Sequence, residues 1–238
     1  MRHILYIIIG ILCLTACQTD QLAPNTARGE LVLTLTRGPK PQVQTRAVDA
    51  DLALTIYNPD GTTYKSYAAG QVPGKIILQA DVEYTLRAYS DNPLWASAND
   101  GKGEACYSGD TTVIVGADEV VYCKYAVPMS NYAVTYTLPD LFNQLFKSKK
   151  FTVGGGGRKV TLDAGEKAYF APSEGFTYQL EATNNDDKTS RHSPLSVDDV
   201  EAGKLYNIKY VYENSVNTGG IDIEITDNTE HEDVDISI

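Results

Sequence analysis

The chain has 238 residues, of which 42% are hydrophobic and 21% are charged, and its formal net charge is −11. This composition supports a packed core and excludes wholesale disorder, while the acidic balance excludes the basic surface that nucleic-acid binding requires. Sixteen tyrosines against one tryptophan and two methionines favour β-structure, because tyrosine suits half-buried strands.

The N-terminal segment has the pattern of an export signal. Arg2 begins a short basic region, an apolar run extends from Ile4 to Leu14, and small residues precede Cys17. The sequence Leu14-Thr15-Ala16-Cys17 resembles a bacterial lipobox, which implies that residues 1–16 are removed and that the Cys17 sulfur is acylated. Two acyl chains would anchor the protein stably, at about 0.8 kcal/mol for each buried methylene. The alternative is an ordinary secretory signal with a coincidental cysteine.

Residues 17–28 are expected to form a polar tether. Gln18-Thr19-Asp20 directly follows the lipobox cysteine and resembles the surface-export tag of lipoproteins in some Gram-negative anaerobes. This resemblance implies a protein held at the outer membrane by its N-terminal lipid and exposed at the cell surface. The alternative is a plain solvated tether.

Residues 29–128 are predicted to form a first β-sandwich. Leu31, Leu33 and Leu35 alternate with more polar residues in the first strand, and Asn58-Pro59-Asp60-Gly61 is a strong turn signal. Short strands at intervals set by turns favour a sandwich. We expect strands at residues 30–36, 51–57, 62–67, 75–78, 82–88, 106–115 and 120–127.

Residues 129–238 are predicted to form a second β-sandwich, so the fold class is all-β. Pro139-Asp140 begins a short amphipathic helix early in this half. Gly154–Gly157 lacks the Lys-Ser/Thr that follows in a phosphate-binding loop, and we interpret it as a hairpin tip. Strands are expected at residues 132–138, 151–153, 160–162, 176–182, 205–212, 221–225 and 234–238.

Three stretches of the first half have counterparts in the second half, in the same order. The pairs are Leu54-Thr55-Ile56 with Phe151-Thr152-Val153, residues 83–88 with 177–182, and residues 121–125 with 205–210. Preserved order favours two copies of one sandwich, joined near residues 128–131. The alternative is that exposed strands simply look alike.

The sequence contains no catalytic constellation, so no enzyme activity, cofactor or metal is expected. His192 and His231, the histidines that follow the signal segment, lie in polar sequence without a catalytic motif, and we expect unpaired surface side chains. The acidic C-terminal end is interpreted as the solvent face of a strand, in preference to a calcium site.

Cys106, Cys123 and Trp95 all lie in the first predicted sandwich. A hairpin turn near residue 117 would place Cys123 opposite residue 112 and not opposite Cys106, which favours two half-buried free thiols over a disulfide. Trp95 lies in the polar loop 91–103, where it is the best single candidate for ligand contact. The alternative is that its ring plugs the end of the sandwich.

Several weak motifs occur in a fixed order along the mature chain. They are the lipobox, Gly29–Leu35, Thr45–Val48, Ile56–Gly61, Cys106–Gly109, Cys123-Lys124 and Asp233–Ile236. Together they resemble an uncharacterised family of surface lipoproteins from gut Gram-negative anaerobes, domain of unknown function 4493. That family resembles fimbrillins and their anchor subunits, which are built from two tandem transthyretin-like β-sandwiches. The resemblance implies adhesion or fimbrial assembly, with fimbrial subunits as partners. The alternative is a surface lipoprotein that binds glycan for nutrient uptake.

The fimbrillin resemblance also singles out Arg46. In polymerising type V pilins a protease cuts after an arginine near the N-terminus and removes the first strand, and a donor strand from the next subunit fills the groove. Arg46 lies in the polar loop after the strand 30–36, where such a cut would fall, and Arg37 is a second candidate. The alternative is a solvated loop arginine and an uncut, anchored protein.

Overall fold

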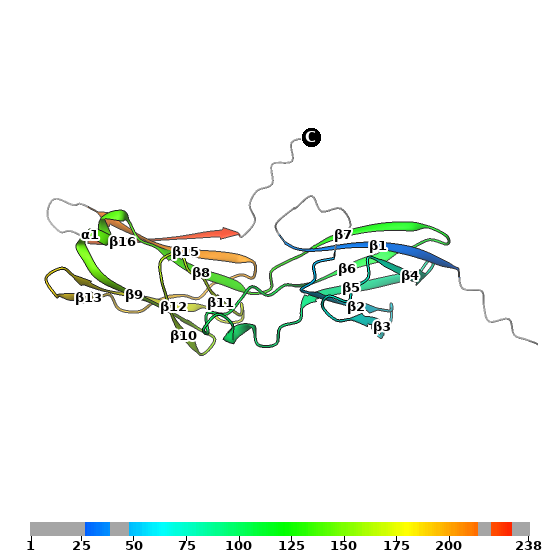
Figure 1. Ribbon diagram of the computed structural model, residues 1–238, viewed down its shortest axis with the longest axis horizontal. Helices are drawn as coiled ribbons and strands as arrows, with labels where there is room; N and C mark the ends of the chain where they lie inside the picture. The colour runs from blue at the N-terminus through cyan, green and yellow to red at the C-terminus, as the bar shows by residue number, and fades with distance from the viewer. Residues whose placement is uncertain (1–26, 39–47, 214–219, 230–238) are drawn as a thin grey trace, which may run out of the picture.

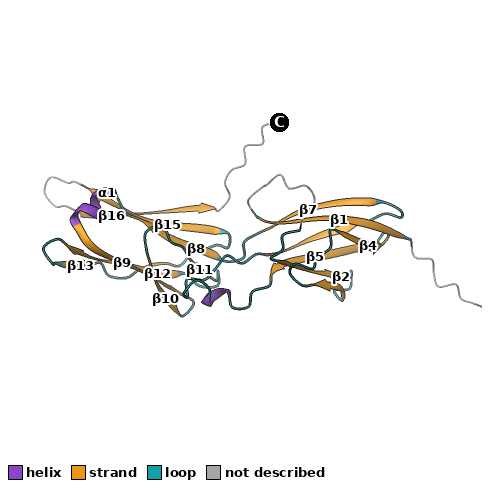
Figure 2. Cartoon of the chain, in the orientation of Figure 1, coloured by secondary structure: helices purple, strands orange, loops and turns teal. Residues whose placement is uncertain are grey.

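The computed structural model describes residues 27–38, 48–213 and 220–229, and strands dominate these ranges (Figures 1 and 2). The strands form four sheets, accompanied by one short helix, α1 (Asp140–Leu145), and one 3-10 turn, η1 (Trp95–Ser97). The predicted all-β sandwich fold with a short helix early in the second half is therefore confirmed. No helix in the described ranges has the length and apolar character needed to cross a membrane.

The first seven strands form two sheets around an aliphatic core. The sheet orders are β4-β1-β7 and β3-β2-β5-β6, with β1 antiparallel to β4 and parallel to β7. Leucine, isoleucine and valine side chains fill the space between the sheets. The strands are β1 (Arg28–Arg37), β2 (Leu52–Tyr57), β3 (Thr63–Tyr67), β4 (Lys75–Gln79), β5 (Glu83–Ser90), β6 (Ser108–Ile114) and β7 (Val120–Val127).

The remaining strands form two sheets around an aromatic core. The sheet orders are β11-β8-β15-β16 and β10-β9-β12-β13, and β14 also pairs with β12. Phenylalanine and tyrosine rings make up much of this second core. The strands are β8 (Tyr132–Thr137), β9 (Phe146–Gly155), β10 (Arg158–Leu162), β11 (Ala168–Phe170), β12 (Phe176–Asn184), β13 (Thr189–Arg191), β14 (Leu195–Val197), β15 (Lys204–Glu213) and β16 (Gly220–Thr229).

The two sets of strands are paired in the same way. Strand β8 is antiparallel to β11 and parallel to β15, as β1 is to β4 and β7, and β9 lies between β10 and β12, as β2 lies between β3 and β5. All three sequence echoes fall in equivalent strands, but the first of them is out of register. Leu86 pairs with Ile56, and its counterpart Leu180 pairs with Phe151, so Phe151 corresponds to Ile56 and not to Leu54.

The sequence pattern missed three short strands. Strands β11, β13 and β14 have three residues each, which is too short for alternation to show. Strand β9 also begins earlier than expected, directly after α1. The strand predicted at residues 234–238 lies outside the described residues, and the predicted domain boundaries at 29–128 and 129–238 stay predictions.

The glycine run Gly154–Gly157, which begins at the end of β9, forms a hairpin tip, as predicted. Arg158 pairs with Gly155, which leaves Gly156 and Gly157 as the two turn residues, with φ of 57° and 71°. Two consecutive positive φ angles are the geometry of a type I′ turn, and glycine adopts them at little cost. The run therefore closes a tight hairpin and positions β10 beside β9.

Candidate functional site

Strand β1 occupies a slot between two partners. It pairs antiparallel with β4 through residues 28–32 and parallel with β7 through residues 30–37. Leu31, Leu33 and Leu35 are fully buried in the core. Burial of three leucines contributes about 5–9 kcal/mol, which is comparable with the whole free energy of unfolding of a typical domain, about 5–15 kcal/mol. Withdrawal of β1 would therefore unfold this sandwich unless another strand took its place.

The C-terminal end of β1 is fixed by Arg37. Its Nε lies 2.7 Å from Asp49 Oδ2 and its Nη1 lies 3.1 Å from Asp51 Oδ2. The Asp49 N–H also donates to the Leu35 carbonyl at 2.9 Å. These contacts hold the start of the β2 segment against the end of β1, and they occupy the Arg37 side chain.

Two of the predicted site residues, Cys17 and Arg46, lie outside the described residues. Their lipidation and cleavage therefore stay predictions. Their places in the sequence still matter, because Cys17 precedes β1 and Arg46 lies between β1 and β2. Hydrolysis after Arg46 would leave β1 and the lipid-bearing segment attached to the rest of the protein only through non-covalent contacts.

Trp95, the third predicted site residue, lies in η1 and is half-buried. The Arg158 guanidinium carbon lies 5.4 Å from the centroid of its ring, which is a cation–π contact between the loop of the first sandwich and β10 of the second. This placement matches the packing alternative. A ligand contact of Trp95 stays a prediction.

Arg158 is the centre of the junction between the two sandwiches. Its Nη1 donates to the carbonyls of Ala96 at 2.5 Å and Gly101 at 2.8 Å, and its Nη2 donates to the Tyr169 carbonyl. Desolvation lowers the pKa of Arg158, and the three carbonyl acceptors offset part of the cost of removing this charge from water. This role could not be predicted from the sequence, in which Arg158 is an ordinary residue after a turn.

Further contacts fix the loop of residues 91–106 against the second sandwich, where it lies beside β10 and β11 (Figure 2). Lys102 Nζ lies 2.6 Å from Glu166 Oε1, and the Tyr169 N–H donates to the Lys102 carbonyl at 2.8 Å. The buried Asn131 donates to the Glu104 carbonyl at 2.8 Å and accepts from the Cys106 N–H at 3.0 Å. The loop of residues 91–106 therefore links the two sandwiches through these polar contacts.

Both cysteines that the structure describes are free and half-buried. Burial, together with the neighbouring Glu104 carboxylate, raises the pKa of Cys106 to about 11, and burial also raises the pKa of Cys123. Thiols with raised pKa values are protonated at neutral pH and react slowly. Within the described ranges, no group of three or more His, Cys, Asp or Glu side chains could hold a metal ion.

The expectation that His192 is an unpaired surface side chain is wrong. Its Nε2 accepts the Leu180 N–H at 2.9 Å and lies 2.9 Å from Tyr210 Oη, while its Nδ1 lies 2.6 Å from the Ser193 carbonyl. Because the Leu180 amide donates to Nε2, the ring proton is assigned to Nδ1. The ring lies between β13 and β14, where it replaces a missing strand partner of β12. The other predicted surface histidine, His231, lies outside the described residues.

A family model described as a domain of unknown function, DUF4493, matches residues 27–238. The chain belongs to this family. No protein with a curated description matches the sequence.

Among solved structures, the DUF4493 chain is similar to a candidate cell adhesion protein from Bacteroides uniformis. The two chains share 11% identity with a TM-score of 0.51, over 85% of this chain and 97% of that one. A candidate cell adhesion protein from Bacteroides eggerthii gives 8% identity and a TM-score of 0.49, over 86% and 96% of the two chains. The tip fimbrial protein Mfa3 from Porphyromonas gingivalis, with a C-terminal truncation, gives 7% and 0.48, over 84% and 99%. The Bacteroides uniformis likeness shows a shared fold over most of both chains.

Proposed function

We propose that this protein is a non-enzymatic, lipid-anchored subunit at the outer cell surface, with a role in adhesion or fimbrial assembly. The fold that it shares with the candidate adhesion protein from Bacteroides uniformis supports this proposal. The observation that carries the proposal is the position of β1. This leucine-rich strand fills the slot between β4 and β7, and the single segment that joins it to β2 contains Arg46.

The proposal gives the protein two forms. In the uncut form, β1 stays paired, the lipid on Cys17 remains covalently attached, and the protein acts as an anchor subunit. In the cut form, water hydrolyses the peptide bond after Arg46, and the N-terminal fragment can leave together with β1. A strand from another subunit would then fill the slot, because the emptied groove exposes the core that Leu31 and its neighbours cover.

The cleavage is tested by expressing the full chain in a Bacteroides host and treating the purified protein with a trypsin-like protease. The expected result is a new N-terminus at Ala47 and a ladder of polymers on a gel. The variant Arg46→Ala should abolish both, and the matched variant Arg37→Ala should abolish neither, because Arg37 is held by Asp49 and Asp51. If the protein stayed monomeric after complete cleavage at Arg46, the proposed assembly role would be wrong.

The lipid anchor has its own test. Mass spectrometry of protein shaved from intact cells should recover peptides of the folded part, and the extracted protein should carry acyl chains on Cys17. The variant Cys17→Ser should lose this added mass and leave the membrane fraction. A Cys17→Ser protein that remained in the membrane fraction would exclude lipid anchoring through this cysteine.

A further inference from the structure

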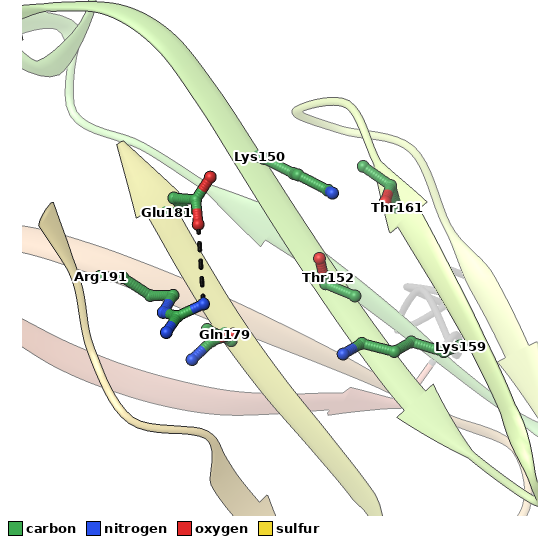
Figure 3. Close-up of a pocket in the computed structure, with 7 residues that line it drawn as sticks. All are labelled: Lys150, Thr152, Lys159, Thr161, Gln179, Glu181 and Arg191. Carbon is green, nitrogen blue, oxygen red and sulfur yellow. Dashed lines mark ion pairs between the residues drawn. The ribbon is translucent and has the colours of Figure 1, made fainter. Parts of the chain in front are cut away.

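A basic hollow lies on the solvent-facing side of the sheet β10-β9-β12-β13 (Figure 3). Its volume is about 410 Å³, which falls within the range of about 300–1,000 Å³ that is typical of small-molecule sites. Seven side chains from four strands line it, and all of them are polar or charged. They are Lys150, Thr152, Lys159, Thr161, Gln179, Glu181 and Arg191.

Strand register explains why these side chains gather. Thr152 pairs with Thr161 on one side and with Gln179 on the other, so these three residues form one row across the sheet. Lys150 pairs with Glu181, which in turn pairs with Arg191, and they form the next row on the same face. The intervening residues of β9 and β12 point the other way and build the aromatic core.

The hollow carries an excess of positive charge in a chain whose net charge is −11. Three cations line it against one carboxylate, and the Arg191 guanidinium lies 3.9 Å from Glu181. Lys150 and Lys159 form no ion pair with any residue in the described ranges. Several lysines elsewhere in the fold pair with acids, as Lys75 does with Glu30 at 2.8 Å, so what distinguishes the hollow is that two unpaired lysines line the same cavity. The two unpaired lysines make this face attractive to an anion.

Neutral groups in the hollow restrict the kind of anion. The hydroxyls of Thr152 and Thr161 can donate and accept hydrogen bonds. The Gln179 Nε2 donates to the His192 carbonyl at 2.6 Å, so the carboxamide is fixed and its oxygen is left as an acceptor. This mixture of hydroxyls, amide oxygen and cations complements a ligand that carries both hydroxyl groups and a negative charge.

A sugar acid carries several hydroxyl groups and a negative charge on one ring, whereas the acidic side chains of a peptide, Asp and Glu, carry no hydroxyl. A peptide binds a sheet mainly by adding a strand to an open edge, whereas this hollow lies on a face where the backbone groups are already paired within the sheet. We propose that the hollow binds a carboxylated or sulfated sugar residue of an acidic polysaccharide. This inference rests on the proposed adhesion function and names its ligand class.

The test is a binding titration with the purified full chain. The probes are a galacturonic acid tetrasaccharide, a chondroitin sulfate tetrasaccharide, neutral maltotetraose and a hexaglutamate peptide. We expect binding of at least one acidic tetrasaccharide, no binding of maltotetraose, and weakening in high salt. The galacturonic acid and chondroitin sulfate arms distinguish carboxylate from sulfate recognition. Failure to bind both acidic sugars, or binding of hexaglutamate in preference to them, would overturn the proposal.

The double variant Lys150→Gln/Lys159→Gln should weaken binding of the acidic tetrasaccharide at least tenfold. The matched control Lys124→Gln/Lys188→Gln removes the same charge from exposed sites that do not line the hollow, and it should change the affinity less than twofold. All four side chains are exposed, so circular dichroism should show both variants folded. An equal loss in the control would mean that only net charge matters, which would also overturn the proposal.

The same variants separate this inference from the proposed assembly role. Cleavage at Arg46 and the polymer ladder are measured on the wild type and on Lys150→Gln/Lys159→Gln. An intact ladder with no sugar binding by the wild type overturns only the hollow as a sugar site. Sugar binding without any ladder overturns only the assembly role.

Discussion

The two sandwiches have the same strand pairing but differently built cores. The first core is aliphatic and contains only one fully buried aromatic ring, that of Tyr84, among the residues described. The second core contains stacked rings, with the Tyr136 and Phe151 centroids 4.2 Å apart and Tyr210 edge-on to Phe151 at 6.4 Å. The comparison teaches that one order of strand pairing can be built around either core, with leucines or with aromatic rings between the sheets.

The sandwiches also differ at one edge. Strand β15 pairs with β16 through ten residue pairs. Strand β7, the counterpart of β15 in the first sandwich, has no partner on its outer edge within the described ranges. The inward-facing Val121 and Cys123 of β7 are accordingly half-buried, while Tyr206 and Ile208 of β15 are buried. The first sandwich is the more open of the two, and it is the one in which we propose strand exchange.

The largest effect is expected from Phe151→Ala. Loss of this fully buried ring should lower the free energy of unfolding by about 3–5 kcal/mol, because it removes ring contacts and leaves a cavity. The register-equivalent Ile56→Ala should cost about 2–5 kcal/mol in the other core. Hydrogen exchange during urea titration should show each variant weakening amides of its own sandwich. If both variants weakened the same amides, the two cores would be one cooperative unit.

The link between the sandwiches is the target of Arg158→Ala. We expect it to weaken their coupling by about 1.5–3 kcal/mol, the usual contribution of a hydrogen bond to a charged group. Calorimetry should show the unfolding transitions of the two sandwiches moving apart. The neighbouring Lys159→Ala is the control, because the Lys159 side chain lines the hollow, whereas that of Arg158 contacts the loop that contains Trp95. Unchanged calorimetric profiles for Arg158→Ala would mean that the contacts of Arg158 with the loop of residues 91–106 do not couple the sandwiches.

A smaller effect is expected from His192→Ala. The first sandwich has no counterpart to this residue, because β6 pairs with β5 through seven residues without interruption. Loss of the ring leaves the Leu180 N–H without its acceptor and should cost about 1–3 kcal/mol. The control Tyr210→Phe keeps the Leu180 bond and should cost about 0.5–1.5 kcal/mol. Faster hydrogen exchange at Leu180 in His192→Ala alone is the specific readout, and equal exchange in both variants would contradict this role.

The smallest effect concerns pH and the ion pair at the junction. The hydrogen bond from Lys102, together with that from the Asp163 N–H, lowers the pKa of Glu166 below its usual 4.5. The ionised carboxylate therefore stabilises the folded state above about pH 4.5, and this contribution is lost as the pH falls through the lowered pKa. In Glu166→Gln the free energy of unfolding should fall slightly less than in the wild type as the pH is lowered from 5 to 3. A profile that matched the wild type between pH 3 and 5 would show that the pair is neutral for stability.

The features that sequence could predict are local ones. The alternation of Leu31, Leu33 and Leu35 predicts β1, and the turn at residues 58–61 predicts the β2–β3 hairpin, because period and turn residues are properties of adjacent positions. The roles of Arg158 and His192 could not be predicted, since the partners that define them, Ala96 and Gly101 for Arg158 and Leu180 and Tyr210 for His192, come from other elements and meet them only through packing. The basic hollow was missed for the same reason. Alternation indicates a polar face, but the alignment of Lys150 with Glu181 depends on a register that no single strand encodes.

The parallel pairing of β1 with β7 has a mechanical consequence. The N-terminal end of β1 leads toward the tether, and the C-terminal end of β7 leads into the second sandwich. If the protein is anchored and binds a target as proposed, tension would pull these ends in opposite directions and would load the eight residue pairs in shear. Hydrogen bonds sheared together resist more force than bonds peeled one at a time. We expect optical tweezers to record a higher rupture force in this direction than for unzipping the β9–β10 hairpin.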